Sequence, residues 1–136
     1  REQMMRIRFF GLFFTAVLFA AFLLPSAASA AEWQTYSRDA YIQSKSAGKI
    51  VLVAVHADWW STCRRQLPLL ESLVKEKAFE NAVAYRVDFD TDKKFLSEHR
   101  VRWQSTLIVF KGEKEVGRSA ADLDKNAIRK LFSRGL

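Results

Sequence analysis

The sequence predicts an α/β fold in which a central mixed β-sheet is flanked by helices on both faces. Three observations predict it. Residues 50–55 form a continuous apolar run of β-branched character, which is typical of a central strand covered on both faces. Residues 83–89 alternate between apolar and polar side chains, as a second strand would. Segments with helical spacing lie between and around these strands, and this alternation of element types is typical of α/β proteins.

The first half of the chain is predicted to run helix, strand, helix. A helix is expected from residue 38 to about 47, with Ser37 as its cap and Gly48 just after its end, where glycine readily takes a left-handed conformation. The strand over residues 50–55 follows. A second helix is expected over residues 61–77, because its leucines recur at helical spacing along one side.

The second half is predicted to contain strands and two further helices. A hairpin is indicated by a glycine-containing turn between two short β-type runs, and an aspartate stands where it would cap a final amphipathic helix. The expected elements are a strand over 83–89, a short helix over 91–98, hairpin strands over 106–110 and 115–118, and a helix that begins after Asp124.

The N-terminal 30 residues have the pattern of a secretory signal peptide. Basic residues precede an apolar run over residues 9–24, and an Ala-x-Ala site follows at residues 28–30. We therefore expect cleavage before Ala31, one mature domain over residues 31–136, and a periplasmic or secreted location. The alternative is an uncleaved anchor, but the apolar run is short beside the roughly 20 residues that a membrane span needs. No stable membrane span is expected after cleavage.

The charge pattern argues against nucleic acid as a partner. The chain carries 22 Lys and Arg against 15 Asp and Glu, a net charge of +7. These charges are interspersed, and neither a recognition helix nor an aromatic-basic platform is present, so a solvated basic surface is expected. His56 and His99 have no companions at metal-ligand spacing, so neither a metal nor another cofactor is predicted. His99 is expected at the surface, near the end of a polar helix.

The most informative segment is Val51–Leu70, VLVAVHADWWSTCRRQLPLL, which contains the only cysteine of the chain. It predicts a buried strand, a short loop with two tryptophans, and a helix with Cys63 in its first turn. This layout resembles the active-site segment of the thioredoxin superfamily, where strand, tryptophan, Cys-x-x-Cys and helix follow in that order. The approach Ala57-Asp58-Trp59 is similar to that of periplasmic thioredoxin-like proteins and of the C-terminal domain of the DsbD reductase.

The resemblance covers almost all of residues 31–136 and implies a thioredoxin-like fold with a degenerate active site. Trp60 stands at the position of the first, nucleophilic cysteine of the family. Ser105 stands where the family has a cis-proline, and we predict a trans peptide because a cis bond before a non-proline residue costs about 2.5–4 kcal/mol. Ala54 replaces a buried aspartate that assists the second cysteine. Together these departures argue against an ordinary dithiol reductase.

The same resemblance implies which residues form the site. Cys63 would be the catalytic residue, and the substrate-binding residues would be Trp59, Trp60, Trp103, Ser105 and Thr106. Two questions stay open at this point. Cys63 is either a packed, inert side chain or a reactive thiol, since the helix N-terminus favours a thiolate and burial opposes it. The tryptophans either line a groove that captures an extended peptide or fill the vacated active site.

Three functions follow as hypotheses. The first is an exported relative of thiol-disulfide oxidoreductases, in which Cys63 forms mixed disulfides with a protein or peptide thiol partner. The second is a redox-inactive module that binds a peptide or protein through its tryptophan-lined former active site. The third is a homodimer linked by a disulfide through Cys63, because an exported protein with one cysteine can pair it only with another molecule.

Overall fold

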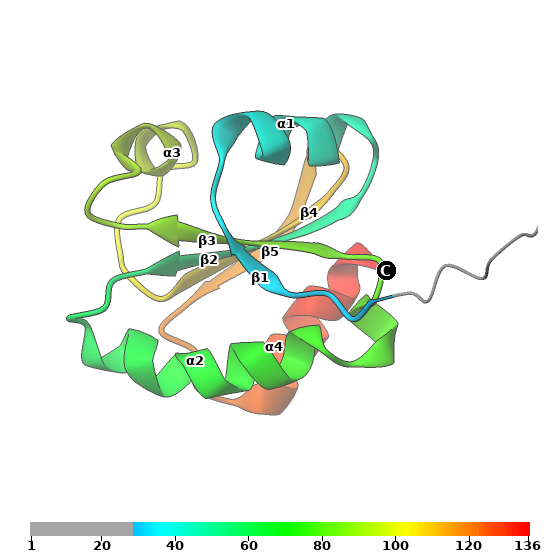
Figure 1. Cartoon of the computed structure of the whole chain (residues 1–136). Helices are drawn as coiled ribbons and strands as arrows, with labels where there is room; N and C mark the ends of the chain where they lie inside the picture. Colours follow the sequence, from blue (N-terminus) through cyan, green and yellow to red (C-terminus); the bar gives the residue numbers. More distant parts are fainter. Residues whose placement is uncertain (1–28) are drawn as a thin grey trace, which may run out of the picture.

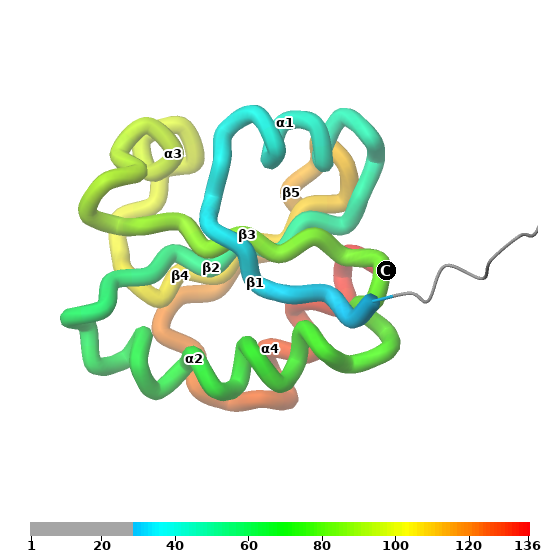
Figure 2. The backbone as a smooth tube through the Cα atoms, viewed as in Figure 1, coloured from blue at the N-terminus to red at the C-terminus, as the bar shows by residue number. Residues whose placement is uncertain are grey.

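A five-stranded sheet between two layers of helices makes up residues 29–136, the part of the chain that the computed structural model describes (Figures 1 and 2). The strands are β1 (Trp33–Thr35), β2 (Ile50–His56), β3 (Val83–Asp88), β4 (Thr106–Lys111) and β5 (Lys114–Ala120). The helices are α1 (Arg38–Ser46), α2 (Ser61–Val74), α3 (Lys93–Glu98) and α4 (Lys125–Phe132), with short 3-10 turns η1 (Lys77–Phe79) and η2 (Ser133–Gly135).

The sheet is mixed, and its central strand is β2. The strand order is β1-β3-β2-β4-β5, with β1 and β2 parallel to β3, and with β4 antiparallel to both β2 and β5. Helices α1 and α3 cover one face of the sheet, whereas α2 and α4 cover the other (Figure 1). Residues 51–55 of β2 are all buried, as an apolar strand with a covered sheet face on each side requires. The predicted α/β architecture is therefore confirmed.

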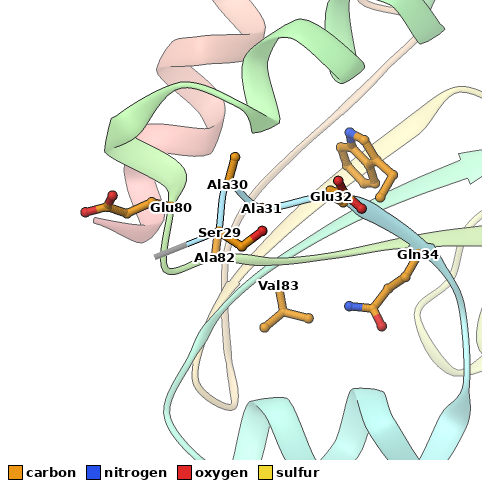
Figure 3. Close-up of a pocket in the computed structure, with 9 residues that line it drawn as sticks. Ser29, Ala30, Ala31, Glu32, Gln34, Glu80, Ala82 and Val83 are labelled. Carbon is orange, nitrogen blue, oxygen red and sulfur yellow. The ribbon is translucent and has the colours of Figure 1, made fainter. Parts of the chain in front are cut away.

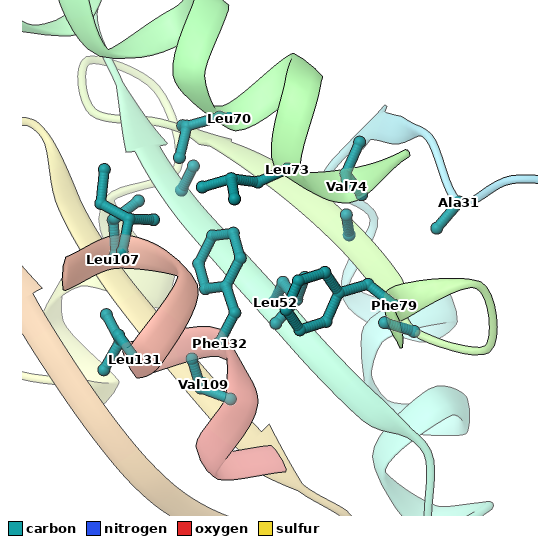
Figure 4. Packing of buried hydrophobic residues seen from close by; sticks show 14 residues of the cluster. Ala31, Leu52, Leu70, Leu73, Val74, Phe79, Leu107, Val109, Leu131 and Phe132 are labelled. Carbon is teal, nitrogen blue, oxygen red and sulfur yellow. The ribbon is translucent and has the colours of Figure 1, made fainter. Parts of the chain in front are cut away.

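Two apolar clusters hold the layers together, one on each face of the sheet. Leu52 of β2, Leu73 of α2 and Phe132 of α4 are fully buried in the first cluster (Figure 4). Tyr41 of α1 and Phe95 of α3 belong to the second. Burial of side chains of this size stabilises the folded state by about 1.5–3 kcal/mol each. The two clusters include residues at the end of β2 and at the start of β4, so these two ends are packed on both faces of the sheet.

His99 is an exception to the sequence prediction, because it is half-buried and not a surface side chain. Its Nε2 lies 3.0 Å from the Tyr41 hydroxyl, and its ring centroid is 4.2 Å from that of Phe95. Burial lowers the pKa of His99 below its ordinary value of 6.5. His99, at the C-terminal end of α3, therefore packs with the aromatic side chains beneath α1 and α3.

Most element ends lie within two residues of the predicted ones, and two differences are larger. Strand β1 was not predicted, and it forms because Trp33 pairs with Ala84 of β3 and donates its indole N–H to the Leu70 carbonyl at 3.0 Å. Helix α2 ends at Val74 and not at residue 77, because Glu76 has an extended backbone, with φ −65° and ψ 141°.

The predicted signal peptide falls almost wholly on residues 1–28, which lie outside the described residues. Within residues 29–136, no helix combines the length and the apolar character that crossing a bilayer requires.

Candidate functional site

Cys63 lies in the first turn of α2, directly beyond the end of β2. The connection between them contains Trp60, which occupies the N-cap position of the helix, and Cys63 is the third helical residue. A tryptophan has no side-chain oxygen with which to cap the first turn. The thiol nevertheless faces inward, because only 2% of the residue is exposed. The single cysteine is thus at the position expected for the second cysteine of the motif, and it is buried.

Ser105 contacts the Cys63 thiol. Its Oγ lies 2.9 Å from the Sγ of Cys63, and its backbone N–H donates to the Val55 carbonyl at 2.9 Å. That carbonyl also accepts from the Cys63 thiol, at 3.9 Å. In the contact between Sγ and Oγ, either the thiol or the serine hydroxyl can be the donor. The loop before β4 and the start of α2 are therefore joined by polar contacts at the buried thiol.

The backbone at Ser105 confirms the predicted trans peptide, since no cis bond occurs in residues 29–136. Ser105 has φ 59°, a left-handed conformation that is uncommon for a residue with a side chain. A proline could neither take this φ nor supply the N–H that Val55 receives. The serine is consequently part of a different loop conformation and does not mimic a proline.

The three tryptophans lie on the surface. Trp59 is 56% exposed, Trp60 40% and Trp103 68%. Trp59 and Trp60 pack edge to face with centroids 5.7 Å apart, and the indole N–H of Trp59 donates to Asp90 Oδ2 at 2.7 Å. Such exposed rings do not fill a vacated cavity. The pair is instead held in a defined orientation with much of its apolar area facing solvent.

Trp103 belongs to a neighbouring part of the same end of the molecule. The β2–α2 and α3–β4 connections lie at the same end of the sheet (Figure 1), and the contact between Cys63 and Ser105 joins them. Trp103 does not stack on the other two indoles, however, and it lines a separate cavity together with Thr106. The predicted juxtaposition therefore holds for the loops, while the ring contact involves Trp59 and Trp60 alone.

Ser105 and Thr106, the two remaining residues predicted to bind substrate, hold the α3–β4 connection through buried contacts. Ser105 is fully buried, and Thr106 is 5% exposed and donates its hydroxyl hydrogen to the Trp103 carbonyl at 2.7 Å. Both side chains are therefore engaged within the protein. They hold the loop that presents Trp103 to solvent, and Thr106 also lines the cavity beside Trp103.

Gln66 is a site residue that the sequence analysis missed. It is 2% exposed, and its side-chain amide donates to the carbonyl of Asp122 at 2.9 Å and of Ser105 at 3.4 Å. A polar residue in the buried stripe of α2, between Cys63 and Leu70, was the available signal. A buried amide needs hydrogen-bond partners. Here its hydrogen bonds join α2 to the α3–β4 and β5–α4 connections.

A second hollow lies at the opposite end of the sheet (Figure 3). It has a volume of about 390 Å³ and lies between residues 29–34 and the turn that precedes β3, which includes Glu80 and Ala82. Its lining contains neither a cysteine nor a histidine. We therefore place the candidate site at the Cys63 end of the sheet.

Comparison with known proteins agrees with this geometry. Trxlp from Edwardsiella tarda is similar over 74% of this chain and 98% of its own, with 36% identity and a TM-score of 0.72. A thioredoxin of Chlamydia trachomatis is 33% identical over 101 residues, which is 74% of this chain and 96% of the relative. The thioredoxin of Trypanosoma brucei brucei, at 19% identity and a TM-score of 0.68, shares the fold. The family model for thioredoxin matches residues 31–134. The chain belongs to the thioredoxin family, with one cysteine where the family motif has two.

Proposed function

We propose that this protein is an exported binding module of the thioredoxin family. It holds an extended segment of a partner protein against Trp59, Trp60 and Trp103, and it does so without a dithiol cycle. The observation that carries the proposal is a contrast in exposure: the thiol is 2% exposed, whereas the indoles are 40–68% exposed. What the site offers to a partner is therefore aromatic surface.

Aromatic rings suit this role because they bury a large area with few rotatable bonds. Trp59 is already oriented by Asp90 and by the ring of Trp60, so little further order is lost when a partner binds. The Trp103 loop is likewise held by Thr106. The surface is thus preorganised, which favours recognition of an extended segment.

Truncation of the indoles tests the proposal. Trp60→Ala and Trp103→Ala are each expected to weaken binding to an array of synthetic extended peptides by roughly 10- to 100-fold, as for an aromatic anchor at an interface. Affinities would be measured by isothermal titration calorimetry on the peptides that the wild type retains. Cys63→Ser and Ile42→Ala, the latter an exposed apolar side chain on α1, are expected to leave the affinities unchanged. An array without binders, or tryptophan variants that bind as the wild type does, would refute the proposal.

Two features of the site favour a second function, in which Cys63 forms a mixed disulfide. The serine hydroxyl 2.9 Å from Sγ can donate to the sulfur, and the thiol lies at the N-terminus of a 14-residue helix. Reactive cysteines in general are often found at helix N-termini. Attack on a disulfide also requires access, however, and the loop at Ser105 would have to open first. The same requirement applies to a homodimer linked through Cys63.

Alkylation of Cys63 separates the two functions. With the loop closed, iodoacetamide is expected to label the folded protein at least about tenfold more slowly than the denatured protein, because the reagent must reach sulfur. The measurement is intact mass against time. Equal rates in the two states, together with a glutathione adduct that Cys63→Ser abolishes, would favour the mixed-disulfide function. A dimer band lost on reduction would favour the linked homodimer.

The export component of the proposal rests on the N-terminal sequence. The basic residues, the apolar run over residues 9–24 and the Ala-x-Ala site at 28–30 support secretion to the periplasm or beyond. Mass spectrometry of the protein purified from cell fractions gives the test, and an N-terminus at Ala31 is the result that fits.

A further inference from the structure

A cavity of about 200 Å³ lies beside the tryptophan surface and is rich in arginine. It is lined by Arg100, Arg102 and Trp103 from the α3–β4 connection, by Thr106 of β4, and by Arg118 and Ala120 of β5. No aspartate or glutamate lines it. The cavity shares Trp103 with the surface proposed to bind a partner segment, so a residue of a segment lying over Trp103 can reach it.

Two of the three arginines are available to a ligand. Arg118 is already engaged, since it donates to Glu115 and to the His99 carbonyl, the latter at 3.0 Å. Arg100 and Arg102 are exposed and take part in no ion pair within the described part of the chain. The wall of the cavity therefore carries positive charge that the protein itself does not neutralise.

The cavity is held open by contacts inside its own wall. The Thr106 hydroxyl donates to the Trp103 carbonyl, and the Arg118 guanidinium donates to the His99 carbonyl, which joins β5 to the end of α3. Arg100 follows α3 with φ 53°, which turns the chain sharply into the loop. These contacts fix the strand and loop backbones around the cavity, so a ligand meets a formed site.

Size and charge together identify the occupant. About 200 Å³ is below the roughly 300–1,000 Å³ of sites for small-molecule ligands, and it suits one side chain. The geometry points to an acidic residue of the bound segment, best a glutamate. Its methylenes would pack on Trp103 and Ala120, and its carboxylate would pair with Arg100 and Arg102. This inference rests on the proposed function, because it names the class of segment that the tryptophan surface receives.

The test uses blocked peptides of one common Ala/Val/Leu background with Glu, Gln or Lys placed at each position in turn. For the wild type, one Glu position is expected to bind at least about tenfold more tightly than its Gln counterpart, as for a charge-assisted pair that is partly shielded from water. Arg100→Gln/Arg102→Gln should abolish this preference and leave the Gln peptide unaffected. Lys75→Gln/Lys77→Gln removes the same charge at the far end of α2 and should keep the preference.

The outcomes distinguish this inference from the function on which it rests. Equal binding of Glu and Gln peptides that still depends on Trp60 and Trp103 would overturn the acidic preference alone. A Glu preference that depends on Arg100 and Arg102 but not on the tryptophans would support the arginine cavity and overturn the tryptophan surface. A preference that survives in the double arginine variant, or the absence of any binding, would overturn the inference.

Discussion

Replacing Ser105 by proline is expected to lower the free energy of unfolding by about 3 kcal/mol or more. The family uses proline at this position, yet here the substitution removes the N–H that donates to Val55 and the hydroxyl beside Cys63. It also forces φ from 59° towards the proline value near −65° in a fully buried residue. Urea unfolding followed by far-UV circular dichroism measures the effect.

Ser105→Gly is the matched control. Glycine accepts a positive φ and keeps the N–H, so only the hydroxyl contact with Cys63 is lost. We expect a stability within about 1 kcal/mol of the wild type, since relief of the left-handed conformation offsets the lost hydrogen bond. If the proline variant were as stable as the glycine variant, the loop would have to adopt a different conformation from the one described.

Trp60→Cys is expected to create a dithiol that the wild type lacks. Trp60 is the N-cap of α2 and Cys63 is the third residue of the helix, so the two side chains are neighbours on the first turn. The new thiol replaces a side chain that is 40% exposed. Accessible thiolates at a helix N-terminus attack disulfides, and the buried cysteine can then resolve the mixed disulfide.

The readouts for Trp60→Cys are an intramolecular disulfide in oxidising buffer and the reduction of a model protein disulfide. Reduction is expected to be at least about a hundredfold faster than with the wild type, because an accessible nucleophile is supplied. Trp60→Ser controls for loss of the indole, and Trp60→Cys/Cys63→Ser controls for a single thiol. A variant that forms no disulfide between the two positions would contradict the assigned geometry of the first turn.

Sequence patterns predicted the parts of the fold that depend on local periodicity. The apolar run became β2, and the glycine turn became the β4–β5 hairpin, with Gly112 at φ 57°. Strand β1 was missed because three residues are too few for an alternation signal, and its strand conformation depends on pairing with β3. The end of α2 was placed too late because local spacing does not show where the chain must turn towards η1.

The candidate site was predictable where it depends on position in a motif. The placement of Cys63 in the first helical turn followed from the sequence pattern, and the trans peptide at Ser105 followed from the family resemblance together with the cost of a cis bond before serine. The carbonyl partners of Gln66 and the cavity containing Arg102 did not, because each joins segments that are far apart in sequence. Whether the tryptophans are exposed or packed also depends on those distant segments, which alternating patterns do not describe.

The placement of the indoles decides what tryptophan spectroscopy reports about this protein. The chain has four tryptophans, and three of them are exposed at the Cys63 end, so its intrinsic emission should be dominated by red-shifted, water-accessible fluorophores. Acrylamide quenching would therefore follow ligand occupancy better than global unfolding. The Trp59–Trp60 pair, with its rings 5.7 Å apart and inclined at 79°, should add an exciton couplet to the circular dichroism spectrum. Loss of that couplet would mark disorder of the β2–α2 loop while the sheet is still intact.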